Sequence, residues 1–384
     1  MSIQLSKLNR LAYKCFAIAK PTALFNQIVL VTLATLMVGR PTAAQVPETT
    51  DAPSQSATDT PLRIGLIGLD TSHATAFTQA FNQEPADPEM MNCRVVAAYP
   101  YGSRSIESSY SRIPDYTEKV KAMGVEIVDS IDDLLPRVDS VLLETNDGTL
   151  HLDQALQVLL AGKPVFIDKP TGANLAEVVA IFRAANQADV PMFSSSSLRY
   201  SAGAQAIRAG KVGAVLGCNA FSPAATEPSH VDLFWYGIHG VESLYTCMGR
   251  GCETVQHTAT ENRELAVGTW SGGRIGTFHG MRNGKKGYGG TAFGEKGIEP
   301  IGTYGGYKPL VIQIAKFFRT GEVPIDPQET IELYAFMQAA WESKQRGGTP
   351  VTIAEVMQAA ESKADELLAD RSVFAADDSS AVER

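Results

Sequence analysis

The stretch from Ala161 to Pro170, Ala-Gly-Lys-Pro-Val-Phe-Ile-Asp-Lys-Pro, constrains the fold of this 384-residue chain more than any other. Its three consecutive apolar residues, Val165–Ile167, are typical of a strand buried inside a parallel sheet. Gly162 and Pro164 mark the end of a preceding helix, and Pro170 prevents the strand from continuing. The stretch therefore predicts an α/β fold with a buried strand that ends abruptly.

Asp168 and Lys169 stand at the predicted carboxyl end of this strand. In open α/β sheets, ligands bind in the crevice outside the carboxyl ends of the strands. The pair is therefore a candidate functional pair. The alternative is a surface Asp-Lys pair that only ends a strand.

The same stretch resembles the Glu-Lys-Pro signature of the glucose-fructose oxidoreductase, inositol dehydrogenase and MocA-type family, with Asp168 in the place of the glutamate. The resemblance implies a Rossmann-type parallel-sheet domain over residues 61–195. It also implies an α+β domain with an open, mainly antiparallel sheet over residues 196–370. A family resemblance of this kind predicts the fold, and the activity has to be argued from the site.

Residues 1–44 have the layout of a signal peptide. They contain five basic residues and no acidic ones, and the apolar run Ile28–Val38 is too short to span a bilayer comfortably. Thr42–Ala44 offers small residues for cleavage, so we expect an exported periplasmic or extracellular protein without a membrane span. An uncleaved anchor is the alternative. Residues 45–60 are expected to form a linker and residues 371–384 a loose tail.

Composition excludes several classes of function. Removal of the five basic residues changes the formal net charge from −9 to −14, and an acidic protein of this kind does not attract nucleic acid. None of the four cysteines beyond the signal segment has zinc-ligand spacing, so no metal site is expected. Cys247 and Cys252 are close enough in sequence for a disulfide, and free buried thiols are the alternative.

The strand-turn-helix pattern around Gly68 corresponds to the dinucleotide frame Gly-x-Gly-x-x-Gly, in which glycines let a pyrophosphate approach the helix N-terminus. Only Gly68 is kept, because Asp70 and His73 occupy the other two glycine positions. Three interpretations stay open. Thr71 and Ser72 could bind a modified cofactor through their hydroxyls, the ligand could be different, or Asp70 could cap the helix.

The second strand ends at Tyr99 without the acidic residue that holds an adenosine ribose, and Ser103 and Arg104 follow. These residues accommodate a 2′-phosphate better than a bare ribose, as NADP would require, and the alternative for Arg104 is a solvated loop residue. By resemblance, Asn146 and His151 cover the nicotinamide ribose. The alternative for His151 is a first-turn helix residue that packs against the strand of Lys169. The complete predicted NAD(P) site is Gly68, Asp70, Thr71, Ser72, His73, Ser103, Arg104, Asn146, His151 and Asp168.

A single helix is predicted from Asp232 onward, with Trp235, His239 and Glu242 on one face. It resembles the family pattern Asp-x-x-x-His-x-x-Asp, with His239 as the catalytic histidine, Glu242 as the last acid and Trp235 in place of the first aspartate. A histidine near neutral pKa beside a lysine suits removal of a hydroxyl proton.

The predicted catalytic residues are therefore Lys169, His239 and Tyr236, and the predicted substrate contacts are Arg199, Tyr200, Trp235 and Glu242. A helix whose histidine only packs against the sheet is the alternative.

Four further segments, 213–220, 254–260, 265–270 and 274–280, alternate like strands of an antiparallel sheet. An open sheet usually covers one face with another subunit, so we expect a homo-oligomer. The best single hypothesis for the function is NAD(P)-dependent oxidation or reduction of a sugar, polyol or related hydroxy compound. An NAD-dependent glycosidase and a non-catalytic carbohydrate-binding protein are the alternatives.

Overall fold

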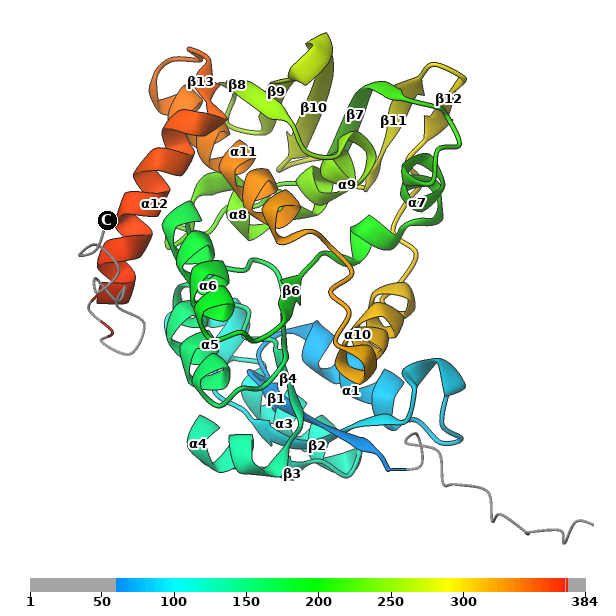
Figure 1. Ribbon diagram of the computed structural model, residues 1–384, viewed down its shortest axis with the longest axis vertical. Coiled ribbons are helices and arrows are strands. Elements are labelled where there is room, and N and C mark those ends of the chain that lie inside the picture. Colours follow the sequence, from blue (N-terminus) through cyan, green and yellow to red (C-terminus); the bar gives the residue numbers. More distant parts are fainter. Residues whose placement is uncertain (1–59, 370, 372–384) are drawn as a thin grey trace, which may run out of the picture. The chain divides into compact units, whose positions relative to one another are not determined.

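The computed structural model describes residues 60–369 and 371. The predicted signal peptide, residues 1–44, lies outside these residues. The described part contains a parallel sheet followed by a second, mainly antiparallel sheet, which confirms the predicted fold class (Figure 1). No helix in it is long and apolar enough to cross a membrane.

The first sheet has six parallel strands in the order β3-β2-β1-β4-β5-β6. Its strands are β1 (Leu62–Ile67), β2 (Cys93–Tyr99), β3 (Glu126–Ile127), β4 (Ser140–Leu143), β5 (Val165–Ile167) and β6 (Met192–Ser194). The order reverses between β1 and β4, and ligands of doubly wound sheets bind at this kind of switch point.

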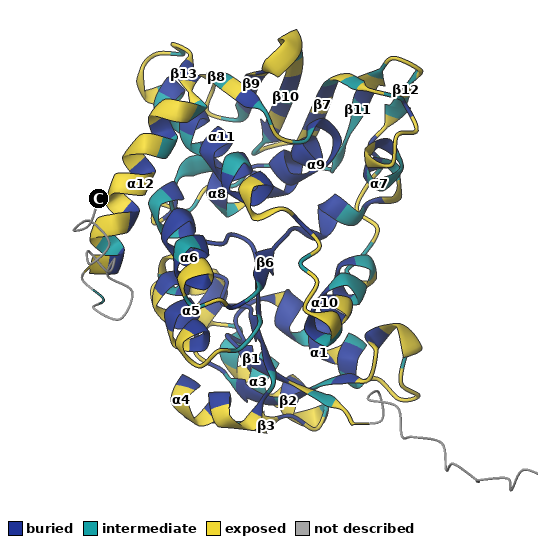
Figure 2. Cartoon of the chain, viewed as in Figure 1, coloured by how far each residue is buried: buried dark blue, intermediate teal, exposed yellow. Residues whose placement is uncertain are grey.

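Helices cover both faces of this sheet. They are α1 (Ser72–Asn82), α2 (Glu107–Tyr110), α3 (Ile113–Ala122), α4 (Ile131–Leu134), α5 (His151–Leu160) and α6 (Leu175–Gln187). Alternate strand residues supply the two cores: Ile64 and Leu66 pack with α1 and α10 (Lys308–Thr320), whereas Ile167 packs with α5 and α6. Figure 2 shows the buried strands between these helices. The late helix α10 thus ties the second half of the chain to the first sheet.

The second sheet has seven strands in the order β12-β11-β7-β10-β9-β8-β13. They are β7 (Val215–Pro223), β8 (Cys252–Ala259), β9 (Arg263–Trp270), β10 (Arg274–Met281), β11 (Gly289–Gly294), β12 (Gly297–Pro300) and β13 (Val351–Thr352). The pair β7–β10 is parallel and all other pairs are antiparallel. One face packs against α9 (Ile238–Met248) and α11 (Pro327–Gln345), and α7 (Ala202–Arg208), α8 (Asp232–Trp235) and α12 (Ile353–Ala369) complete the domain.

One expectation from the sequence is corrected here, and one open alternative is decided. The single helix predicted from Asp232 is two helices, because α8 ends at Trp235 and α9 begins at Ile238. Tyr236 leaves helical geometry with φ −126° and ψ −27°, so Trp235 does not share a helix face with His239. Among the described cysteines there is no disulfide, because Cys93, Cys218, Cys247 and Cys252 are all free and buried.

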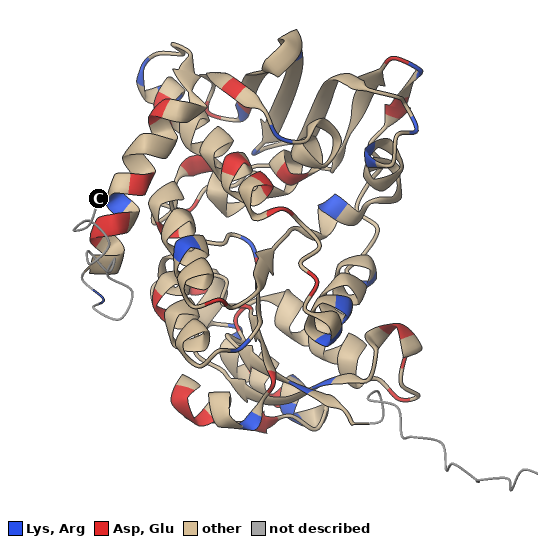
Figure 3. Cartoon of the chain, viewed as in Figure 1, with Lys and Arg blue, Asp and Glu red and all other residues tan. Residues whose placement is uncertain are grey.

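Charged side chains of both signs are interspersed over both sheets and their helices (Figure 3). Side chains cap the start of two helices. The Thr71 side chain accepts a hydrogen bond from the His73 amide at the start of α1, and Asn174 accepts one from Glu177 at the start of α6. The caps fix where these helices begin, and α1 therefore starts directly above the carboxyl end of β1.

Candidate active site

The structure brings eight of the predicted site residues into one pocket of about 220 Å³ at the carboxyl edge of the first sheet. The pocket is lined by Thr71, Ser72, His73, Asn146, Lys169, Trp235, Tyr236 and His239, together with Ser108, Arg112 and Tyr307. Its volume is below the roughly 300–1,000 Å³ that encloses a drug-sized ligand. A single sugar ring or another small ligand is therefore the size of compound that it suits.

His239 is buried at the start of α9, and its Nδ1 lies 2.7 Å from Ser196 Oγ. Burial, and then the nearby Lys169, hold the pKa of His239 well below its ordinary value. The imidazole is therefore neutral at neutral pH. With Nδ1 engaged by Ser196, Nε2 is the ring nitrogen left to meet a ligand, as a general base requires.

Aromatic rings surround His239. The Tyr236 ring is 5.1 Å from the imidazole and the Tyr288 ring is 5.9 Å away, both edge to face. Tyr304 packs on Tyr288 and on Tyr307, whose ring lies 4.7 Å from His73. Tyrosines present an apolar ring with a polar hydroxyl, and this combination suits the faces and hydroxyls of a carbohydrate.

Asp168 and Glu144 lie side by side beneath the pocket, fully buried at the ends of β5 and β4. Asp168 Oδ2 pairs with His73 Nδ1 at 2.7 Å. Burial, and then the charge of Asp168, raise the pKa of Glu144 well above its ordinary value. The first turn of α1, where the sequence predicts cofactor binding by His73, is thus connected to the end of β5 through the Asp168 carboxylate.

Asp70 joins three loops at the switch point. Its carboxylate accepts hydrogen bonds from the backbone amides of Ser103 and Asn146, each at 2.9 Å, and we call this arrangement the Asp70 clasp. Burial raises the pKa of Asp70 to about 6. Since Thr71 is the N-cap residue of α1, the interpretation of Asp70 as a helix cap is wrong.

The clasp lies where the loops after β1, β2 and β4 meet at the carboxyl edge of the first sheet. A Cβ at Gly102 would lie 2.1 Å from Asp70 Oδ2, so the loop after β2 is packed directly on this carboxylate. Ser103 Oγ donates to Asp147 at 2.8 Å, and Asn146 donates to Ser109 Oγ at 2.9 Å. The loops after β2 and β4 are thus linked to each other as well as to Asp70.

A second hollow lies on the other side of the clasp. It is lined by Tyr99, Tyr101, Gly102, Arg104, Ser105, Asp147, Thr149, Leu150 and Gln154. The Arg104 guanidinium lies 5.5 Å from the centre of the Tyr101 ring. Arg104 therefore lines this hollow, and its role in binding a 2′-phosphate stays a prediction, whereas the hydroxyl of Ser103 is buried and engaged by Asp147.

The remaining predicted residues lie outside the pocket lining. Arg199 is buried and forms ion pairs with Glu242 and with Glu329, the latter at 2.7 Å. Tyr200 packs against the core that includes α10. His151 is fully buried as the first residue of α5, and its Nε2 lies 2.6 Å from the Thr145 carbonyl. Gly68, with φ +87°, would place a Cβ 2.6 Å from the Thr145 backbone.

Sequence reasoning missed five residues of this region: Ser108, Ser196, Arg112, Tyr288 and Tyr307. The run Ser194–Ser197 after β6 was a usable signal, because it stands at the same sheet edge as Lys169. The tyrosines lie in glycine-rich loops whose periodicity predicts nothing about their position.

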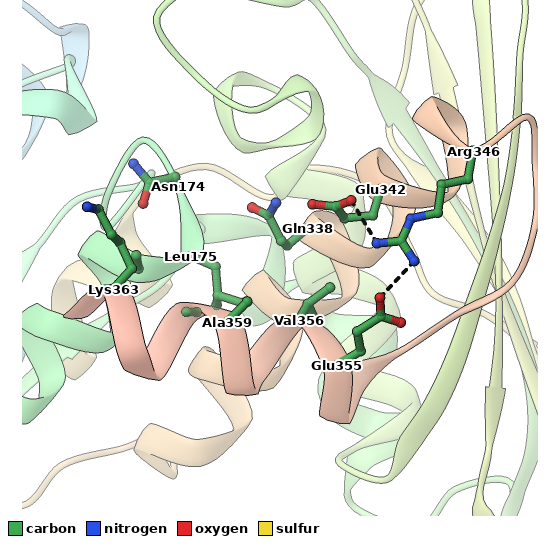
Figure 4. A pocket seen from close by; sticks show the side chains of 11 residues that line it. Asn174, Leu175, Gln338, Glu342, Arg346, Glu355, Val356, Ala359 and Lys363 are labelled. Carbon is green, nitrogen blue, oxygen red and sulfur yellow. Dashed lines mark hydrogen bonds and ion pairs between the residues drawn. The ribbon is translucent and has the colours of Figure 1, made fainter. Parts of the chain in front are cut away.

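A groove of about 240 Å³ between α6, α11 and α12 is not a candidate for chemistry (Figure 4). Arg346 pairs there with Glu342 at 3.1 Å and with Glu355 at 2.7 Å. Its charged groups are thus engaged with one another on helices that carry no other feature of a site.

Comparison with known proteins agrees with this architecture. Residues 62–196 match the profile of the "Oxidoreductase family, NAD-binding Rossmann fold", the Gfo/Idh/MocA family. This match confirms the predicted resemblance, because residues 62–196 are similar to the NAD-binding part of that oxidoreductase family.

Solved structures extend the likeness to both sheets. A probable dehydrogenase from Thermotoga maritima is 19% identical with a TM-score of 0.62, and the match covers 77% of this chain and 100% of that one. The scyllo-inositol dehydrogenase from Lactobacillus casei, with NAD(H) and scyllo-inositol, is 16% identical with a TM-score of 0.61 over 77% and 100% of the two chains. An Agrobacterium radiobacter oxidoreductase, in complex with NAD+, L-tartaric acid and magnesium, is 15% identical, with a TM-score of 0.61 over 77% and 99%. At these identities the likeness shows the fold.

Proposed function

We propose that this chain is an oxidoreductase that acts on a small hydroxyl-rich compound, such as a sugar or polyol, bound in the pocket of Lys169 and His239. The observation that carries the proposal is the meeting of a lysine, a neutral buried histidine and several tyrosines in one small pocket. The NAD(H) and scyllo-inositol of the Lactobacillus casei relative support this class of cofactor and substrate.

The roles of the side chains follow from their positions. Lys169 follows β5 and presents its positive charge to the pocket, where it would polarise a substrate oxygen. His239 Nε2 would take or return the hydroxyl proton, since Ser196 holds the opposite ring nitrogen. Tyr236 and Trp235 would contact the substrate ring. When bound, nicotinamide would supply the hydride chemistry of the reaction.

Binding of both ligands can be measured separately. Trp235 lines the pocket, so a panel of sugars and polyols should change the tryptophan fluorescence in a saturable way, and Trp235→Phe should remove that change. Trp270, which is fully buried, provides the matched control as Trp270→Phe. No saturable change with any compound would contradict the proposed pocket.

For the dinucleotide, we propose that Arg104 gives NADP(H) an advantage over NAD(H), because a guanidinium pairs well with a phosphate. Titration of both nucleotides should show tighter binding of NADP(H) and loss of that preference in Arg104→Ala. Asp70→Gly, which restores the second glycine of the frame, should strengthen binding of both nucleotides. Equal affinities in the unaltered protein would contradict the preference.

We further propose export through residues 1–44. Fractionation of the native cells and N-terminal sequencing should find the mature protein outside the cytoplasm, beginning near residue 45. A cytoplasmic protein that retains Met1 would contradict export.

A further inference from the structure

We propose that His73, Glu144 and Asp168 form a binding site for a divalent metal ion beneath the pocket. Each of the three buried residues offers one ligand atom, and these atoms all lie within 4.8 Å of one another. The inference is independent of the proposed oxidoreductase activity, because it concerns ion binding alone.

The three residues come from segments that the sheet brings together. Glu144 directly follows β4, Asp168 directly follows β5, and His73 is in the first turn of α1 after β1. These three strands are neighbours in the order β1-β4-β5, and their carboxyl ends share one edge. The spacing of 71 and 24 residues along the chain explains why no sequence motif predicts the site.

The carboxylate oxygens of the cluster are largely without hydrogen-bond partners among the described residues. Within residues 60–369, both carboxylate oxygens of Glu144 and the Oδ1 of Asp168 lack a hydrogen-bond partner, although both side chains are fully buried. Only Asp168 Oδ2 is engaged, by His73 Nδ1 at 2.7 Å. Buried carboxylates of native proteins are paired, hydrogen-bonded or bound to a metal, because an isolated buried charge is very costly.

The ligand set indicates the class of ion. One imidazole nitrogen with two carboxylate oxygens suits a divalent first-row ion such as Mn²⁺, Fe²⁺ or Zn²⁺, whereas Mg²⁺ and Ca²⁺ prefer oxygen alone. Bonds of about 2.0–2.2 Å place two ligand atoms of one ion at most about 4.4 Å apart. The side chains would therefore close by a few tenths of an ångström on binding.

The position of the site connects it with the pocket. His73 lines the pocket wall beside Lys169, while Glu144 and Asp168 lie fully buried behind it. An ion held here would balance the two carboxylates and fix the first turn of α1 relative to β4 and β5. Three protein ligands leave further coordination positions for water or a ligand oxygen.

The test uses the full chain, stripped with a chelator and titrated calorimetrically with MnCl₂ and with ZnCl₂. We expect one ion per chain for at least one of the two metals. Glu144→Gln keeps the shape of the side chain and removes its charge, and it should weaken binding at least about tenfold. Glu177→Gln is the matched control, because this largely buried carboxylate is engaged by the Ala173 amide and lies outside the cluster.

A second variant and a spectroscopic readout guard against a folding defect. His73→Gln should also weaken binding, and Mn²⁺ in the unaltered protein should show electron–nuclear coupling to an imidazole nitrogen that this variant lacks. Absence of stoichiometric binding of either metal, or equal affinity in Glu144→Gln and the unaltered protein, would overturn the site. Infrared spectroscopy provides a further check. A band of a protonated carboxyl group that is present both after chelation and after addition of metal, and that is lost in Glu144→Gln, would show that Glu144 binds a proton instead of the ion. This result would equally overturn the site.

Discussion

Ser196 decides how His239 can act, although it touches no predicted ligand. Its hydroxyl lies 2.7 Å from His239 Nδ1 and replaces the aspartate that the resemblance led us to expect at Trp235. Ser196→Ala should therefore lower kcat with little change in KM. The reason is that the imidazole would lose its fixed tautomer, whereas the contacts of the substrate would stay in place. Ser196→Thr should restore part of kcat. An unchanged kcat in Ser196→Ala would contradict this positioning role.

The hydrogen bonds of Asp70 hold three loops together, and a substitution should reveal how much they contribute to stability. Asp70→Ala leaves the amides of Ser103 and Asn146 without their acceptor, and each unpaired buried group costs about 1–3 kcal/mol. Urea unfolding should show this loss in the free energy of unfolding. The exposed Asp129 gives the control, since Asp129→Ala should change stability by less than about 0.5 kcal/mol. Equal stabilities of the two variants would mean that the clasp contributes nothing.

Among the elements of the described part of the chain, the second sheet exposes large apolar side chains on one face. In the register of the sheet, Gly217 of β7 lies between Ile275 of β10 and Phe293 of β11. Phe293 in turn lies opposite Ile298 of β12. The three large side chains therefore form one exposed row across four strands. We propose that a second copy of the chain covers this face, because soluble monomers rarely expose such a continuous patch.

Ile275→Glu should therefore convert an oligomer to monomers in analytical ultracentrifugation. Ile275 is 53% exposed in the single chain, so a monomer should tolerate the substitution. Leu160→Glu, at a residue 54% exposed on α5, should leave the assembly intact. A monomeric unaltered protein would contradict the proposed interface.

The elements also show how far sequence reasoning reaches. The strand at Val165–Ile167 and the caps at Thr71 and Asn174 were predictable, because local physics fixes them. The break between α8 and α9 was not, since the apolar spacing continues through Tyr236 and Gly237. The strand β11 has four glycines or small residues in six and carries no alternation that periodicity could detect.

The site was predictable only in part for a similar reason. Lys169 and His239 stand in motifs, and the structure places both in one pocket. Glu144 ends an apolar strand without any motif, and its neighbours His73 and Asp168 are distant in sequence. The sequence shows that Asp70 places a negative charge where a phosphate would be expected. Its two amide donors, however, come from loops whose packing no local pattern specifies.

For the whole molecule, a buried charge network predicts how stability depends on pH. Burial alone would raise the pKa of Glu264, but the adjacent His257 at 2.5 Å, together with Arg282 and Lys344, lowers it to about 2. The unfolded chain has the ordinary value of 4.5. The carboxylate therefore stabilises the fold above about pH 4.5 and loses this effect as pH falls toward 2.

Urea unfolding between pH 6 and pH 2.5 should thus show a steep loss of stability that is shallower in Glu264→Gln. Glu322→Gln on the exposed loop after α10 is the matched control and should leave the slope unchanged. A slope in Glu264→Gln as steep as in the unaltered protein would assign acid unfolding to other groups.

The central claim is that Lys169 and His239 work as one unit on a hydroxyl-rich substrate, and turnover of single and double variants tests it most directly. The panel of sugars and polyols would be assayed with NADP+ and NAD+ for the unaltered protein, Lys169→Met, His239→Asn and the double variant. We predict that His239→Asn lowers kcat/KM by about 10²–10⁴ and that the double variant is little worse than the worse single variant. His279→Asn, at an exposed histidine of β10, should keep full activity. Turnover that survives unchanged in Lys169→Met or His239→Asn would contradict the account.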